Sequence, residues 1–183
     1  MEGFKLSDER YEEIKEIIVD MFETYHVSCV PINAFEIATR MGVKVIPYSA
    51  FDERIKSLMM KESEDGFTKI NCGVYTIYYN DSKRYGRINN TIMHEIGHIV
   101  LGHLEESELA EAEAKFFAKY ALAPPPLIHK LKLTSPEQIE YFFEISYKAA
   151  CYAYDYYQKW ICYGDREYTA YEIRTLALFK EVM

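Results

Sequence analysis

One short motif in the chain combines residue types and a spacing that could do chemistry: His94-Glu95-Ile96-Gly97-His98. On a helix, residues four apart lie one turn apart on the same face, so both imidazoles can reach one ion. Glu95 lies on the neighbouring flank, where it can accept a proton from a metal-bound water without being a ligand. The spacing therefore predicts a zinc site on His94 and His98, with Glu95 as the catalytic residue.

The residues on either side of the motif indicate that its helix is buried. The segments Thr91-Ile92-Met93 and Ile99-Val100-Leu101 are both largely apolar. Two histidines and a glutamate on a buried helix are costly unless something pairs with them. The alternative interpretation, two solvent-facing histidines on an ordinary helix, is disfavoured by these flanks.

A catalytic zinc site needs a third protein ligand and leaves its fourth position for water. The metzincin pattern would place a glycine three residues and a histidine six residues after His98. Here Gly102 and His103 follow at plus four and plus five, and His103 lies about 140° around the helix from His98. We expect His103 beside the site or at the helix end, with a ligand role as the less favoured alternative.

The next predicted helix supplies carboxylates for the third position. The neighbours of Glu113 at helical spacing are mostly apolar: Leu109, Ala110, Phe116, Phe117 and Tyr120. The neighbours of Glu111 are mixed: Ser107, Glu108, Ala114, Lys115 and Ala118. A carboxylate centred on an apolar face must be paired, and a zinc ion is a fitting partner. The sequence thus favours Glu113 as the third ligand, with Glu111 as the less favoured alternative.

Hydrophobic periodicity and capping residues predict an α+β chain. Helices are expected over residues 7–25, 33–42, 51–60, 87–103, 107–122, 135–143, 146–160 and from 169 onward. Strands are expected over residues 43–48, 67–70 and 73–79. Pro124-Pro125-Pro126 should end the helix that carries the carboxylates. Because no repeat or linker divides the chain, we predict a single domain over residues 1–183. Its catalytic core would cover about 30–125, and a helical C-terminal extension would cover 135–183.

Composition limits the partners and the compartment. The chain has 21 Lys and Arg against 29 Asp and Glu, a net charge of −8, which disfavours direct binding to nucleic acid. It begins without an apolar signal segment and has no run of about 18 apolar residues, so no membrane partner is expected. The four cysteines are scattered and form no CxxC pair. They are typical of reduced thiols, and we expect a cytoplasmic location.

Residues 136–160 have the outline of a helix-turn-helix, with the turn at Ile145-Ser146. The second of these helices offers Lys148, carries Asp155 and contains no arginine. Reading DNA requires several basic or amide side chains, so packing or contact with a protein is favoured. A non-enzymatic or DNA-binding regulatory protein is therefore the alternative hypothesis. Glu95 favours the enzyme, because a purely structural metal site has no need of it.

Four segments in order resemble the ImmA/IrrE-type metallo-endopeptidases of bacteria and their mobile elements. They are residues 33–38 with 41–45, Arg87 with residues 91–103, residues 113–118 through Pro124, and residues 143–150. The resemblance covers roughly residues 30 to 155 of the chain. Lys115 departs from the pattern, since asparagine is usual at its position.

The resemblance implies a mostly helical, zincin-like metalloprotease domain with a small β-sheet and a helical extension. It implies zinc bound by His94, His98 and Glu113, with Glu95 as general base and acid, and no other cofactor. The implied activity is endopeptidase cleavage of a regulatory protein, often a phage-like or stress-response repressor. The expected partner is therefore a protein substrate, most simply a helix-turn-helix repressor. His103, Arg87 and a tyrosine all remain open as the oxyanion stabiliser.

Overall fold

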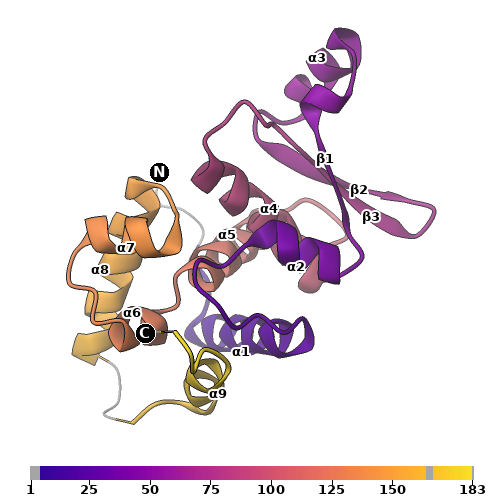
Figure 1. Cartoon of the computed structure of the whole chain (residues 1–183). Coiled ribbons are helices and arrows are strands. Elements are labelled where there is room, and N and C mark those ends of the chain that lie inside the picture. Colours follow the sequence, from indigo (N-terminus) through magenta and orange to yellow (C-terminus); the bar gives the residue numbers. More distant parts are fainter. Residues whose placement is uncertain (1–4, 164–166, 183) are drawn as a thin grey trace.

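The sheet lies at one end of the molecule and the C-terminal helices lie at the other, with α4 and α5 between them (Figure 1). The structure is a computed structural model that describes residues 5–163 and 167–182. Its sheet contains β1 (Lys44–Pro47), β2 (Gly66–Asn71) and β3 (Val74–Tyr79) in the order β1-β3-β2. β1 is parallel to β3, whereas β2 is antiparallel to it, so β2 forms one edge of the sheet.

Helices make up most of the described chain. They are α1 (Asp8–Thr24), α2 (Ala34–Arg40), α3 (Glu53–Glu62), α4 (Tyr85–Val100), α5 (Glu108–Leu122), α6 (Pro125–Lys130), α7 (Pro136–Phe143), α8 (Tyr147–Tyr163) and α9 (Ala170–Leu178), with a 3₁₀ turn at Tyr48–Ala50. The predicted mostly helical α+β class with a small sheet is confirmed. Within the described residues, no helix is both long and apolar enough to cross a membrane.

Side-chain caps explain why several helices begin where the sequence predicts. Ser7, Ser107 and Ser135 each accept a hydrogen bond from a backbone N–H three residues further on. Each such cap is worth about 1 kcal/mol, since it satisfies an N–H group that the first helical turn leaves unpaired. Thr169 and Glu172 form a complete capping box at the start of α9.

The sequence prediction missed one helix, α6. The proline run ends α5 as expected, but Pro125 and Pro126 then form the first turn of α6. Proline fits there because the first helical turn does not use its N–H groups and needs the φ angle that the proline ring imposes. The same run therefore stops one helix and starts the next.

α4 is the central element that positions the motif. It contacts β2 and β3 on the sheet side and α2 and α5 on the helical side. Its apolar residues Ile92, Met93 and Ile96 are fully buried in the core, which leaves the remaining face for the histidines. Burial of these side chains fixes the rotation of α4 about its own axis.

Gly97 allows α5 to approach α4 closely within the motif itself. A Cβ atom built on Gly97 would lie 3.1 Å from Cδ1 and 3.2 Å from Cβ of Phe117, which is fully buried on α5. Such contacts are tighter than ordinary van der Waals separations. The glycine in the motif is therefore explained by helix packing.

We expect Gly97→Val to lower the free energy of unfolding by about 1–3 kcal/mol, because the branched side chain overpacks the contact with Phe117. Urea denaturation of the full chain measures this change. Gly97→Ala is the matched control, and we expect it to be near neutral, because its better helix propensity of up to about 1 kcal/mol offsets a milder contact. A valine variant as stable as the wild type would show that Gly97 is not needed for packing.

Candidate metal centre

The two histidines of the motif meet one carboxylate from α5. The Nε2 atoms of His94 and His98 are 3.1 Å apart. Oε1 of Glu111 lies 3.3 Å from Nε2 of His98 and 3.6 Å from Nε2 of His94. Among the described residues, these three form a group whose ligand atoms are close enough to hold one metal ion.

The three separations fit a tetrahedral ion. Zinc bonds of about 2.0–2.2 Å to nitrogen and oxygen place tetrahedral ligand atoms about 3.3–3.6 Å apart. The observed separations of 3.1, 3.3 and 3.6 Å lie at or near this range. Two imidazoles and one carboxylate are also the donor types of a catalytic zinc site, which keeps its fourth position open. The residues present therefore fit a zinc ion.

The protonation states suit metal binding as well. Burial, followed by the neighbouring His94, lowers the pKa of His98 to about 4, so its imidazole is neutral near pH 7. Interaction with His94, and then with Lys115, holds the pKa of Glu111 well below its usual range. Metal ligands must be in these deprotonated forms. Nζ of Lys115 lies 3.0 Å from Oε2 of Glu111, so it orients the carboxylate and leaves Oε1 directed at the histidines.

Glu113, the third ligand that the sequence favoured, is not brought to the histidine pair. It is buried and receives two hydrogen bonds from Arg10 of α1, Nε to Oε1 at 2.7 Å and Nη2 to Oε2 at 3.1 Å. Nε2 of His103 lies 2.7 Å from its Oε2. We therefore correct the candidate third ligand from Glu113 to Glu111. A buried carboxylate does need a partner, but here that partner is a guanidinium.

His103 lies beside the site and connects it to this ion pair. Its Nδ1 is 2.9 Å from Nδ1 of His98, the ring nitrogen that points away from the candidate metal position. A histidine that binds a metal usually has its second ring nitrogen held by a polar partner. Arg10, Glu113 and His103 thus form a chain of polar contacts that orients the ring of His98.

We expect Arg10→Met to lower the free energy of unfolding by about 1–3 kcal/mol, because Glu113 would keep a buried charge and lose its strongest donor. Urea denaturation measures the loss. The control is Arg54→Met on α3, where the arginine is exposed and forms no ion pair with the described residues. Equal stability of Arg10→Met and the control would show that the ion pair adds nothing to folding.

Glu95 lies next to the histidines without joining the ligand group. It is 8% exposed, and Oγ1 of Thr68 on β2 donates a hydrogen bond of 2.7 Å to its Oε2. Burial raises the pKa of Glu95, while Thr68 and His94 act in the opposite direction. A carboxyl group with a raised pKa is better matched to proton transfer near neutral pH. The sequence alone did not reveal Thr68, because its contact with Glu95 spans two separate elements.

An open cleft of about 990 Å³ gives access to these groups. β2 lines one side, α4 and α5 line another, and residues 103–106 form part of the rim. Tyr75 is the tyrosine that lines this cleft among the described residues. Arg87, the other open candidate for an oxyanion stabiliser, makes two hydrogen bonds of 2.7 Å to Asp65 and does not line the cleft.

The fold and the site together define a mostly helical, zincin-like α+β protein with a candidate metal centre on its HExxH helix. The model of the peptidase M78 family, described as the IrrE N-terminal-like domain, matches residues 38–154. This match covers well over half of the chain, and the chain belongs to that family of peptidases. The predicted resemblance to the ImmA/IrrE family is thereby confirmed. No curated protein matches the chain.

Proposed function

We propose that the chain is a zinc endopeptidase that uses His94, His98 and Glu111 to hold the metal. The observation that carries this proposal is the convergence of the three ligand atoms in an open cleft, with Glu95 buried beside them. The chemistry of the donor set supports zinc, because two imidazoles and one carboxylate leave one tetrahedral position free.

Each remaining group has a role that follows from its position. A bound zinc ion supplies Lewis acidity, which makes water a nucleophile near neutral pH and polarises a peptide carbonyl. Glu95 accepts the proton of the attacking water and returns it to the leaving amine. Thr68 holds the Glu95 carboxylate by its hydrogen bond of 2.7 Å. His103 keeps the ring of His98 in place.

A polypeptide substrate is supported by the edge strand beside the cleft. β2 pairs with β3 on one side only, and its residues Phe67, Thr68 and Ile70 line the cleft. An extended segment can add to such an edge through backbone hydrogen bonds. The proposal that this substrate is a regulatory protein, in particular a helix-turn-helix repressor, is based on the resemblance to the ImmA/IrrE family. Cleavage in the cytoplasm is part of the same proposal.

Cleavage can be tested without knowing the substrate in advance. The zinc-loaded protein and its Glu95→Gln variant are incubated with the total protein of the native host, and new N-termini are identified by mass spectrometry. We expect new termini in very few proteins, a helix-turn-helix protein among them, and none with the variant. Casein should be digested slowly at most. An absence of new termini would count against the peptidase, and brisk casein digestion would indicate a general protease.

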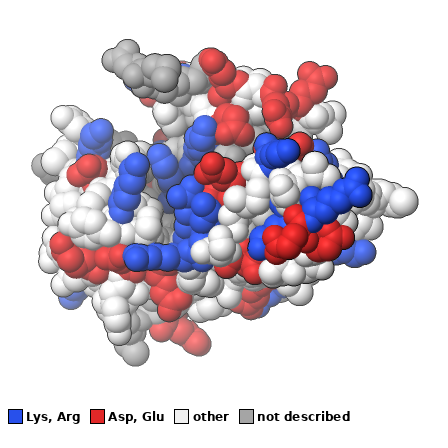
Figure 2. All heavy atoms as spheres, turned by 90° about the horizontal axis from the view of Figure 1, so that it is seen from above, with Lys and Arg blue, Asp and Glu red and all other residues white. Residues whose placement is uncertain are grey.

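The alternative, a DNA-binding regulator, predicts a different result. Figure 2 shows a central band of Lys and Arg side chains on the face seen from above, with further Lys and Arg side chains on either side of it and Asp and Glu side chains among and around them. The net charge of −8 opposes binding to phosphates. We therefore expect no micromolar binding to random duplex DNA at about 150 mM salt, measured by fluorescence anisotropy. Micromolar binding would favour the alternative.

A further inference from the structure

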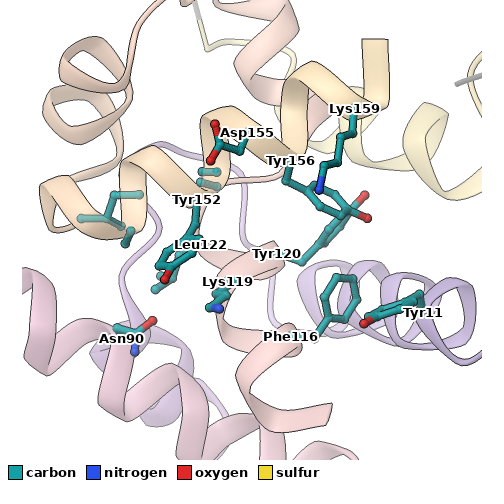
Figure 3. A pocket seen from close by; sticks show the side chains of 14 residues that line it. Tyr11, Asn90, Phe116, Lys119, Tyr120, Leu122, Tyr152, Asp155, Tyr156 and Lys159 are labelled. Atoms are coloured by element: carbon teal, nitrogen blue, oxygen red, sulfur yellow. The ribbon is translucent and has the colours of Figure 1, made fainter. Parts of the chain in front are cut away.

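A second cavity, of about 400 Å³, lies among helices α1, α4, α5 and α8 (Figure 3). Aromatic rings form much of its wall: Tyr11, Phe116, Tyr120, Tyr152 and Tyr156. Asn90 of α4 lines both this cavity and the metal cleft. The volume lies within the range of about 300–1,000 Å³ that is typical of small-ligand sites. No role proposed above makes use of this cavity.

The cavity wall includes a lysine without an acidic partner. Nζ of Lys119 lies 4.6 Å from the centroid of the Tyr152 ring, and no carboxylate of the described residues lies within ion-pair distance of it. Burial, and then the neighbouring cations Lys115 and Lys148, lower the pKa of Lys119. Lys119 is exposed on α5, and the protein groups nearest to its ammonium are aromatic and cationic. An anion that enters the cavity is therefore the complementary species.

Lys15, a nearby lysine in similar aromatic surroundings, differs from Lys119 because it has an acidic partner. Nζ of Lys15 lies within 6 Å of the centroids of the Tyr120 and Tyr156 rings, but it also has a carboxylate, Glu12, at 2.6 Å. The residues that line the cavity include two lysines, Lys119 and Lys159, and one carboxylate, Asp155. Within the described residues, no ion pair joins either lysine to Asp155. The cavity thus has an excess of positive charge, although the whole chain is acidic.

We propose that this cavity binds a small molecule that combines a flat apolar ring system with one anionic group. The ring system packs among the tyrosine and phenylalanine rings, where offset or edge contacts between aromatic groups are favourable. The anion lies against Lys119, for which the structure offers no acidic side chain. The cavity adjoins the metal cleft at Asn90 but contains neither Glu95 nor the candidate ligands, and the proposal does not depend on peptidase activity.

The fluorescent probe 1-anilinonaphthalene-8-sulfonate has both of these properties and tests the site in the full chain. We expect saturable binding with a blue-shifted emission. The dissociation constant should be about fivefold higher in Lys119→Met, which is the largest loss expected when an exposed ion pair is removed. The neutral probe N-phenyl-1-naphthylamine should change less than twofold. Lys44→Met, on β1 and exposed, is the matched control and should bind both probes as the wild type does.

A second variant tests whether the probe binds in the cavity. A competition experiment tests which class of ligand the cavity prefers. Ala153→Trp fills the cavity and should remove binding of both probes, with the melting temperature measured alongside. 2-Naphthoate should displace the sulfonate probe more strongly than 2-naphthamide does. The proposal is overturned if neither Lys119→Met nor Ala153→Trp changes probe binding. It is also overturned if the peptide acetyl-Phe-Glu-amide displaces the probe better than 2-naphthoate, because the cavity would then hold a polypeptide segment.

Discussion

Replacing Glu95 by glutamine is expected to lower the rate of peptide cleavage by about 10²–10⁴-fold while zinc content and stability remain those of the wild type. The reason is that Glu95 is buried next to the histidines and hydrogen-bonded to Thr68, yet it is not part of the ligand group. Glutamine keeps the shape of the side chain and can still accept the hydrogen bond. It cannot take up a proton as a carboxylate does.

The rate is measured on the substrate identified from new N-termini, with zinc content determined on the same samples. Glu108→Gln is the matched control, since this exposed glutamate in the first turn of α5 lies outside the cleft and should leave the rate unchanged. If Glu95→Gln cleaved as fast as the wild type, Glu95 would not be the general base. If it lost zinc, Glu95 would have to be treated as a ligand.

The second large effect separates Glu111 from Glu113. Glu111→Gln is expected to weaken zinc binding by at least about 100-fold, because it removes the charged ligand from the group. Glu113→Gln should weaken zinc binding by no more than about tenfold, the lower end for groups that orient a ligand, because Glu113 reaches His98 only through His103. Competition with a chromophoric chelator measures both affinities, with His98→Ala as the reference for a lost ligand.

The order of the two effects decides the assignment. A larger loss in Glu113→Gln than in Glu111→Gln would restore Glu113 as the third ligand and make the correction wrong. Glu113→Gln also weakens the pairing with Arg10, so the chelator titration is carried out on protein whose urea denaturation curve has been recorded. This keeps a loss of folding distinct from a loss of a ligand.

Local features of the sequence predicted much of the fold. The Ser7, Ser107 and Ser135 caps and the helical spacing of His94 and His98 depend on residues within one turn of each other, and such patterns can be read directly. The sequence did not predict helix α6 or the position of Glu111, for two different reasons. α6 was missed because proline was taken as a helix stop, although it is also favourable in a first helical turn.

The third ligand could not be derived from local pattern, because the partner of Glu113 is Arg10, about a hundred positions earlier in the chain. An apolar helix face indicates burial, but it does not say which group supplies the compensating charge. Glu111 is 41% exposed at its side chain because it faces an open cleft. A metal that substrate must reach lies in an open cleft, so its ligands can be partly exposed. The mixed polar and apolar neighbours of Glu111 were therefore the sequence feature that indicated its position.

The most direct test of the account is the position of the metal itself. Anomalous diffraction data collected on either side of the zinc absorption edge, from crystals of the zinc-loaded protein, locate the ion without reference to activity. We expect one peak per chain, at about 2.0–2.2 Å from Nε2 of His94, Nε2 of His98 and Oε1 of Glu111. A peak bound by His103 and Glu113 instead, or no peak at the motif, would contradict this expectation.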